Sequence, residues 1–367
     1  MTDTAIVGGG PAGAAAAIAL RVAGVPVTLL ERSRETGDAI CGGFLSWRTL
    51  AALERLGIQR PELTGHRVTT LRLFAARKSF QSALPRPALG VSRHHLDTLL
   101  LARAGALGAV VERGVRVRGI DQDGAANLIR LDDGANIVSR AVFLATGKYE
   151  LASHRRDPPE QQRREPAVGL RLRIPPSSQL VATLSGAIEL HLFDRGYAGL
   201  VLHEDGSANL CMAMRKSLLA EADADPLRLI QRLGNSNPAL GDRLAYADWS
   251  KPIDAIAAVP YGWRASQTTR GQFRIGDQAG VIASLAGEGM GIALASARNA
   301  VEAFMSDGAQ ASMRFQERFA RRLRSPMAVA DLAWRAGEHP GTARIGLAGL
   351  GFAPWLAPII ARVTRVA

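Results

Sequence analysis

The sequence has few of the residues that mark several large classes of protein. Only Cys41 and Cys211 are cysteines among 367 residues, which excludes a disulfide framework and predicts a reducing compartment. Aromatic residues make up 5% of the chain, no basic run is interleaved with them, and no zinc-ligand spacing occurs, so nucleic-acid binding is not expected. The adjacent His94 and His95 have no third ligand in view, so we expect no metal site.

Acidic residues are also scarce, since 45 Lys and Arg stand against 33 Asp and Glu, for a formal net charge of +12. Such an excess favours acidic substrates, anionic cofactors or a membrane surface, although an arginine-rich solvated surface gives the same balance. No signal peptide is visible, because Asp3 is followed at once by a glycine-rich turn; we therefore expect a cytoplasmic protein. A hydrophobic content of 47% predicts a globular chain with about two domains.

The glycine-rich turn near the start carries the first recognisable motif. A short apolar strand, residues 5–7, leads into Gly8, Gly10 and Gly13 in G-x-G-x-x-G spacing, and an alanine-rich helix follows through Val22. A second apolar run then ends at Glu31. Strand, turn, helix, strand and acid in this order predict a dinucleotide site: the helix start faces the pyrophosphate, and the Glu31 carboxylate accepts the ribose hydroxyls.

A second glycine-rich stretch lies far along the chain. A predicted strand delivers Asp277 to a turn, and the run Gly287 to Gly291 precedes a helix expected over 292–305. Asp277 is suited to bond a polyol, while the loop amides and the helix start suit an electron-rich ring edge. Arg93, just inside a helix that Ser92 can cap, is placed to reach an anion. Together these features predict a flavin dinucleotide.

Between these two glycine-rich motifs the sequence predicts further strands, a linker and a second sheet. After a strand at 68–74 and a break at Pro85 and Pro87, we expect a hairpin over 127–138 and a strand from Arg140 into Thr146 and Gly147. A polar segment at 153–166 reads as a linker, and alternating strands beyond it predict an antiparallel sheet with a helix at 226–233. No second G-x-G-x-x-G unit occurs, so a separate NAD(P)H domain is not expected.

Taken together, the motifs resemble the two-domain FAD enzymes of the para-hydroxybenzoate hydroxylase and geranylgeranyl reductase superfamily. The Cys41-Gly42-Gly43 loop is similar to the geranylgeranyl reductase branch. The resemblance implies an α/β fold: a Rossmann-type, glutathione reductase-like FAD domain, an inserted antiparallel-sheet substrate domain and a C-terminal helical segment. The expected FAD domain covers 1–66, 88–152 and 265–310, the substrate domain 67–87 and 166–264, and the helical region 311–367.

The resemblance also implies which residues contact the cofactor. Gly8, Gly10, Gly13 and Glu31 would hold the ADP half, Arg93 and Asp277 the middle, and the loop from Gly287 to Gly291 the isoalloxazine edge. The full predicted set is Gly8, Gly10, Pro11, Ala12, Gly13, Glu31, Arg32, Cys41, Gly42, Arg93, Thr146, Gly147, Asp277, Gly280, Gly287, Gly289, Met290 and Gly291.

Three positions depart from the patterns of these families. Thr146-Gly147 stands where the hydroxylases carry Asp-Gly, and Ser284 replaces a proline usual before the G-E-G loop. Of the substrate motif of prenyl reductases, the chain keeps only Tyr197.

The resemblance leaves three functions open. The main expectation is an FAD-dependent reductase that transfers hydride to a C=C bond of a hydrophobic small molecule. The alternative is a flavin monooxygenase acting on an aromatic or polyketide-like substrate, and the third is a flavin protein that only relays electrons. NAD(P)H or a protein electron donor would reduce the flavin. Cys41 and Tyr197 are the candidate proton donors, although Cys41 is equally typical of a small buried side chain.

The C-terminal segment bears on the substrate. Residues 345–361 are uncharged and contain Trp355 between two prolines, with Arg344 and Arg362 beside them. Its glycines, prolines and short length argue against a membrane-spanning helix. The segment is expected to be an apolar flap over the site, a peripheral membrane anchor within 345–367, or helices packed on the FAD domain.

Overall fold

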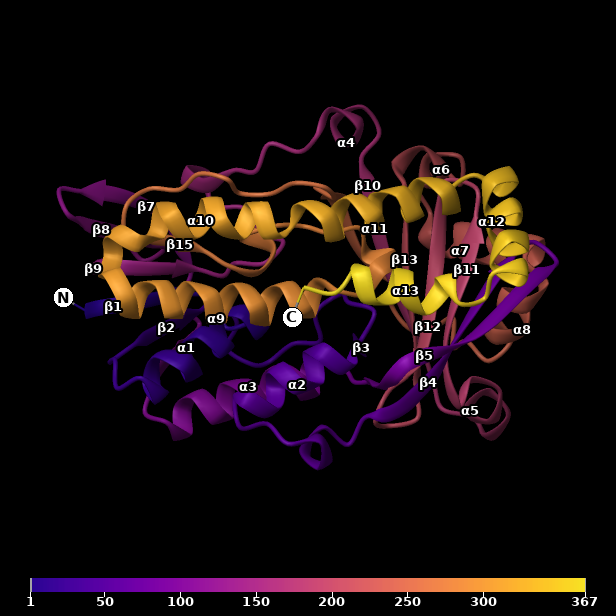
Figure 1. Ribbon diagram of the computed structural model, residues 1–367, viewed down its shortest axis with the longest axis horizontal. Coiled ribbons are helices and arrows are strands. Elements are labelled where there is room, and N and C mark those ends of the chain that lie inside the picture. Colours follow the sequence, from indigo (N-terminus) through magenta and orange to yellow (C-terminus); the bar gives the residue numbers. More distant parts are fainter. Residues whose placement is uncertain (1, 367) are drawn as a thin grey trace.

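Two β-sheets lie side by side along the molecule in the computed structural model, which describes residues 2–366 (Figure 1). The first sheet has the strand order β6-β2-β1-β9-β8-β7, with β15 paired to β9. Its core is parallel, and β7, β8 and β9 add an antiparallel meander that includes the predicted hairpin. These strands are β1 (Thr2–Val7), β2 (Thr28–Glu31), β6 (Val110–Arg113), β7 (Val117–Asp123), β8 (Ala126–Leu131), β9 (Asn136–Leu144) and β15 (Gln272–Arg274).

The second sheet has the order β14-β10-β13-β12-β11-β4-β5-β3. The prediction of an antiparallel sheet holds for most neighbours but is wrong for β11, which runs parallel to β4. The residues between the two strands include the whole meander and the linker, and the chain re-enters this sheet at the end where β4 begins, with Gly186 opposite Val68. The strands are β3 (Phe44–Leu45), β4 (His66–Ala75), β5 (Lys78–Gly90), β10 (Ala167–Ile174), β11 (Gly186–Phe193), β12 (Gly196–Leu202), β13 (Ala208–Arg215) and β14 (Asp254–Val259).

The predicted break at Pro85 and Pro87 is wrong, because β5 runs through both prolines. The pairing of β5 with β4 shifts register there: Ala83 lies opposite Thr70, and Ala88 lies opposite Val68. The extra residues form a bulge, where a proline that cannot donate a hydrogen bond is tolerated.

Helices cover both sheets. Beside the first sheet lie α1 (Pro11–Val22), α2 (Trp47–Arg55), α3 (Arg93–Ala106), α9 (Gly289–Asp307) and α10 (Ala311–Arg322). Over the second lie α5 (Ser178–Leu184), α6 (Lys216–Ala220), α7 (Pro226–Ser236) and α8 (Pro238–Leu244), while α4 (Glu160–Arg164) lies in the linker. The last three helices, α11 (Arg324–Gly337), α12 (Pro340–Phe352) and α13 (Leu356–Val363), run to the far end of the second sheet and back (Figure 1).

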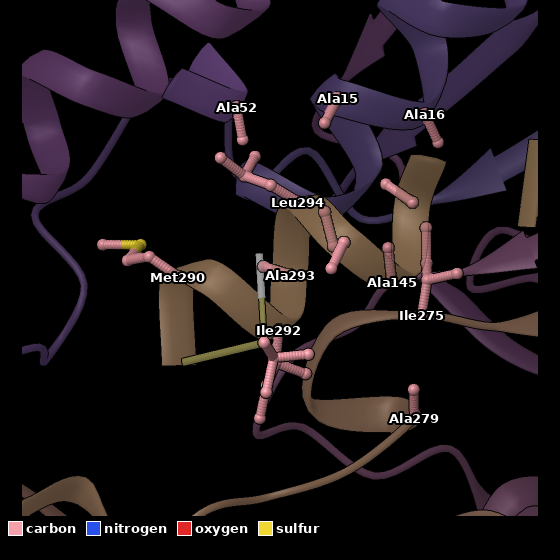
Figure 2. Packing of buried hydrophobic residues seen from close by; sticks show 14 of the residues in the cluster. Ala15, Ala16, Ala52, Ala145, Ile275, Ala279, Met290, Ile292, Ala293 and Leu294 are labelled. Atoms are coloured by element: carbon pink, nitrogen blue, oxygen red, sulfur yellow. The ribbon is translucent and has the colours of Figure 1, made fainter. Parts of the chain in front are cut away.

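Small side chains fill much of the core where α1 meets α9. Ala15 and Ala16 of α1 belong to the same buried cluster as Ala293 and Leu294 of α9 (Figure 2). Alanine favours helix and lets two helices approach closely, so the predicted alanine-rich helix can pack directly against α9. This packing fixes the starts of both helices, which the sequence places at the dinucleotide turn and at the second glycine-rich loop.

The predicted linker is tied to the protein at Arg156, whose side chain is only 1% exposed. Its guanidinium donates to the carbonyls of Gly147 (3.1 Å), Lys148 (2.7 Å) and Asp277 (3.1 Å), and it pairs with Glu150. Arg156 therefore satisfies the carbonyls of two loops at once and fixes this part of the predicted linker to the protein.

The last two helices, α12 and α13, are composed mainly of apolar residues. No single helix within residues 2–366 is long and apolar enough to cross a membrane, although α12 and α13 pass that test as a pair bent by 114°. The bend follows from Pro354, because the residue before a proline disfavours helical geometry, and α12 ends at Phe352.

Candidate functional site

The dinucleotide turn adopts the geometry that its glycines predict. Gly8 has a φ of +107°, and a side chain there would lie 2.4 Å from the carbonyl oxygen of Ala145. At Gly13 a Cβ would lie 1.9 Å from the Gly8 carbonyl oxygen, so only glycine lets α1 pack this closely on the turn. Gly10 caps α1, and Pro11 occupies its first turn, which leaves the positive end of the helix facing a cavity.

Glu31 lies at the end of β2 and reaches back over this turn. Its Oε2 accepts a hydrogen bond from the Gly9 amide at 2.7 Å, and its Oε1 accepts one from the Ser33 amide at 2.8 Å. A carboxylate has about four acceptor sites, so each oxygen can take a further bond from a ribose hydroxyl. The two backbone bonds orient Glu31 for that role.

Arg93 lies beside the same turn, as predicted for a phosphate contact. Its Nη2 is 3.5 Å from the position that a Cβ on Gly10 would take. Asp97, one helical turn later, holds the guanidinium through two hydrogen bonds of 2.9 Å and 2.7 Å. Burial opposes the charge, but Asp97 outweighs it and raises the pKa of Arg93, so the cation persists at any physiological pH.

The second glycine-rich loop begins α9, and its acid is the best-buried part of the site. Glu288 is completely buried and forms an ion pair with Arg365, with Nη1 and Oε2 2.7 Å apart. The Val366 amide donates to the other carboxylate oxygen at 2.8 Å, and Arg365 also donates to the Gly287 carbonyl at 3.1 Å. The end of the chain is thus bonded to the loop predicted to border the flavin ring.

Tyr197, a candidate proton donor, belongs to a hydrogen-bonded group that sequence reasoning missed. Its hydroxyl donates to Ser284 Oγ at 2.9 Å, and the hydroxyl of Tyr261 lies 2.8 Å from the same atom. Both rings contact Trp334, at centroid distances of 5.7 Å and 5.6 Å. Burial raises the pKa of Tyr197 and of Tyr261, so both hydroxyls keep their protons at neutral pH.

This group explains one departure of the chain from the pattern of the families that it resembles. Ser284 stands where a proline is usual, and a proline could not bridge the two tyrosines. The sequence signal that could have indicated this group is Ser284 at the usual proline position, together with Tyr261, which lies 64 residues beyond Tyr197.

Cys41 and Gly42 line the same cavity in a loop held on the second sheet. Asn209 of β13 donates to the Cys41 carbonyl at 2.9 Å. Asp38, earlier in the loop, pairs with Arg171 at 2.9 Å and with Arg173. Burial opposes the charge of Asp38, but these two arginines lower its pKa. The other cysteine, Cys211, also lines the cavity, and burial raises its pKa to about 12, so it is a thiol.

These features surround one cavity of about 1260 Å³, larger than the 300–1,000 Å³ typical of a site for one small ligand. Most of the residues predicted to contact the cofactor line it: Gly8, Gly10, Pro11, Ala12, Glu31, Arg32, Cys41, Gly42, Arg93, Thr146, Gly147, Asp277, Gly287, Gly289 and Met290. Tyr197 lines it as well. The arrangement fits an extended FAD, because one cavity is bordered by the start of α1, the Glu31 carboxylate, the Arg93 cation and the start of α9.

Three predicted contacts are absent from the cavity lining within residues 2–366, and packing explains each. Gly13 lies against the turn, as described above. A Cβ on Gly280 would lie 2.5 Å from Leu323 of the helix pair α10 and α11, and one on Gly291 would lie 2.0 Å from the Glu288 carboxylate. These glycines allow close approach of protein to protein, and their contact with the cofactor stays a prediction. The described residues also include no group of three metal-ligating side chains.

Comparisons with known proteins agree with this geometry. Residues 1–144 match the FAD binding domain family. Menaquinone reductase of Mycolicibacterium smegmatis is 30% identical over 152 residues, which cover 40% of this chain and 37% of that protein. Anhydrotetracycline monooxygenase of Streptomyces rimosus is 35% identical over 127 residues, 33% of this chain and 25% of that protein. The chain thus spans about a third of the length of these relatives.

The solved structures extend the likeness to the whole fold. The flavin-dependent brominase Bmp2 superposes with a TM-score of 0.82 at 16% identity, covering 99% of this chain and 93% of the brominase. The predicted α/β fold with an FAD-binding domain is confirmed, and FAD is the cofactor of that domain. The comparisons support an FAD-dependent oxidoreductase. The two curated relatives named above are a menaquinone reductase and a monooxygenase, and they do not support the geranylgeranyl reductase branch in particular.

Proposed function

We propose that the chain is an FAD-dependent monooxygenase that hydroxylates a large apolar substrate, aromatic or polyketide-like, with NAD(P)H or a protein donor supplying electrons. The observation that carries the proposal is the apolar extension of the cavity beyond the residues assigned to FAD. The likeness to anhydrotetracycline monooxygenase supports the same reaction class, in preference to the reduction of a C=C bond.

The extension lies between the second sheet and the C-terminal helices. On the sheet side it is lined by Leu73 of β4 and by Ile188 and Leu190 of β11. Leu347 of α12 and Ala357 of α13 line the opposite side. Aliphatic walls on both sides suit a flat hydrophobic molecule, and they keep water away from its reacting carbon.

Bound FAD would supply the redox chemistry, and the chain's own residues would position and protect it. Glu31 and Arg93 hold the two ends of the ADP moiety, and the start of α9 favours negative charge at the ring edge. Tyr197 keeps its proton at the hydroxyl oxygen and can donate a hydrogen bond into the cavity if it leaves Ser284. Trp334 covers the two tyrosines and excludes water from them.

Reduction of a C=C bond is the second candidate function, and specific observations favour it. The Cys41-Gly42-Gly43 loop lines the cavity, and a named relative is a menaquinone reductase. That relative matches over 152 residues, which do not reach the full substrate sheet. An electron-relay protein is the third candidate, and the apolar extension argues against it, because electron transfer alone needs no such space.

We infer the same domain division that the sequence predicts, with FAD-binding segments 1–66, 88–152 and 265–310 around an inserted substrate domain. Membership of the two sheets supports this division. The exceptions are β3 (Phe44–Leu45), His66 at the start of β4 and residues 88–90 at the end of β5, which belong to the second sheet although they lie within the predicted FAD-binding segments.

The test is turnover by the FAD-loaded full chain with NADPH under air and under anaerobic conditions. Anhydrotetracycline and a menaquinone serve as probes of the two reaction classes. A monooxygenase consumes oxygen with the first probe and yields a product heavier by one oxygen atom. Anaerobic turnover with a gain of two hydrogens would instead establish the reductase.

A matched pair of variants links turnover to the proposed chamber. Leu190→Gln places a polar group in the apolar wall and should raise KM for the probe at least about fivefold, since burying an unpaired amide costs roughly 1–3 kcal/mol. Leu332→Gln makes the same change on a side chain that is 70% exposed and should leave KM unchanged.

A further inference from the structure

Helix α12 lies at the end of the molecule farthest from β1, and α13 runs back from it toward the middle (Figure 1). Both helices expose large apolar side chains. Phe352 is 92% exposed, Ile345 74% and Trp355 63%. Ile359 and Val363 of α13 are 44% and 46% exposed. We call these five residues the apolar elbow. Side chains of this size are unusual on a water-facing surface when they gather on two consecutive helices.

The opposite faces of the same two helices line the cavity. Ala343 and Leu347 of α12 and Ala357 and Ala361 of α13 contribute to its wall. Positions 345 and 352 lie on one side of α12, and 343 and 347 lie about half a turn away. A single layer of helix therefore separates the apolar elbow from the proposed substrate chamber, and much of this layer is glycine or alanine.

The charge around the apolar elbow has one sign. No Asp or Glu occurs between residues 339 and 367, whereas Arg344 and Arg362 are both exposed. Arg365, the third arginine of the segment, points inward to Glu288. An apolar face flanked by exposed arginines complements the acyl and headgroup layers of an anionic bilayer. It suits a second copy of the chain less well, because a symmetric contact would bring the arginines of both copies together.

We propose that the apolar elbow docks on an anionic phospholipid bilayer and that lipophilic substrate passes from the membrane into the chamber between α12 and α13. The second part rests on the proposed function, which requires a hydrophobic substrate. Phe352 and Trp355 insert at the 114° bend, and Arg344 and Arg362 contact the lipid phosphates. The substrate then reaches the wall formed by Leu347 and Ala357 without crossing bulk water.

Docking is measured without substrate, by sedimentation of the FAD-loaded full chain with phosphatidylcholine vesicles that contain or lack phosphatidylglycerol. The full chain should bind the anionic vesicles and bind them less as salt rises. Phe352→Ser with Trp355→Ser should weaken binding at least about tenfold, because two buried aromatic side chains are lost. The matched control, Val22→Ser with Met313→Ser, alters exposed residues of α1 and α10 and should bind as the parent does.

Two further measurements separate the contributions. Arg344→Gln with Arg362→Gln should remove the preference for anionic vesicles. Tryptophan emission should shift to the blue on binding, and Trp355→Phe should lose that shift while it still binds, because Phe keeps an aromatic side chain at the bend.

Equal vesicle binding by the elbow variant and its control would overturn the proposal. So would a concentration-dependent dimer, seen by sedimentation velocity, that the elbow variant dissolves, because the elbow would then face a second copy. Retention of bound FAD by each variant checks that it is folded. Docking without turnover of either probe would contradict the proposed function alone, and turnover without docking would contradict the elbow alone.

Discussion

Replacing Arg365 with methionine tests whether the end of the chain stabilises the loop at the start of α9. Methionine keeps most of the length and apolar surface of arginine but removes the cation that faces Glu288. Both partners of the pair are nearly inaccessible, with side-chain exposures of 6% for Arg365 and 0% for Glu288. Removing one partner of such a pair leaves a buried charge and costs about 3–5 kcal/mol.

The remaining bonds of Glu288 place the expected loss near the lower end of that range. The Val366 amide still donates to Glu288 at 2.8 Å, and Ser46 Oγ lies 3.5 Å away. We therefore expect Arg365→Met to lower the free energy of unfolding by about 3 kcal/mol. Adding Glu288→Gln should recover much of this loss, because the double variant buries no charge and its amide oxygen can still accept from Val366.

The assay is equilibrium unfolding in urea, with the midpoint compared at an unchanged slope. The control is Arg298→Met, which removes an exposed pair with Glu302 whose side chains are 53% and 60% accessible. That change should cost less than about 0.5 kcal/mol. The dissociation constant for FAD gives a second readout, and it should rise for Arg365→Met, because Arg365 also bonds the Gly287 carbonyl.

Two results would refute this reasoning. An Arg365→Met variant as stable as the Arg298→Met control would show that the buried pair adds nothing. A double variant less stable than Arg365→Met would show that Glu288 is not the group left uncompensated.

Three other predictions concern the site and its surroundings. Ser284→Ala should lower the free energy of unfolding by about 2 kcal/mol, because it leaves two buried tyrosine hydroxyls without their shared partner. The loss should exceed that of Tyr197→Phe, and equal losses in urea unfolding would contradict this prediction. Burial, aided by Arg173, lowers the pKa of His203 to about 4. Between pH 6.5 and 4 the unfolded chain therefore binds a proton that the folded chain does not, and the stability of the fold falls as the pH falls. His203→Asn should reduce that fall by about 3 kcal/mol, and an unchanged pH profile would argue against a neutral buried histidine. Glu31→Gln should weaken FAD binding at least about tenfold, as measured by fluorescence titration. The control Glu112→Gln, on the exposed neighbouring strand, should leave the affinity unchanged. Equal affinities of the two variants would show that Glu31 does not bind the ribose.

Local sequence was sufficient wherever the physical cause is local. The glycine spacing around Gly8 and Gly13 reflects steric contacts within one turn, so it predicted the first strand, the first helix and the dinucleotide turn that joins them. Ser46 and Ser92 cap helices α2 and α3, and each side chain accepts a hydrogen bond from the amide three residues later. The starts of these two helices were therefore also predictable from local sequence. Alternation along 187–193 predicted β11, but alternation does not determine which neighbour a strand pairs with, and its parallel partner β4 was missed.

Tertiary structure decided whatever depends on residues far apart in the chain. Glu288 and Arg365 are 77 residues apart, and Tyr197 and Ser284 are 87 apart, so no local pattern announces either contact. Arg156 resembles a linker residue until the fold brings three carbonyls to it. The C-terminal segment could have been a flap, an anchor or packed helices. In the structure its inner face lines the cavity and its outer face is exposed, because the bend at Pro354 turns α13 back across the second sheet. Composition determined that this segment is apolar, and only the fold decided which side chains the cavity receives and which remain for another surface.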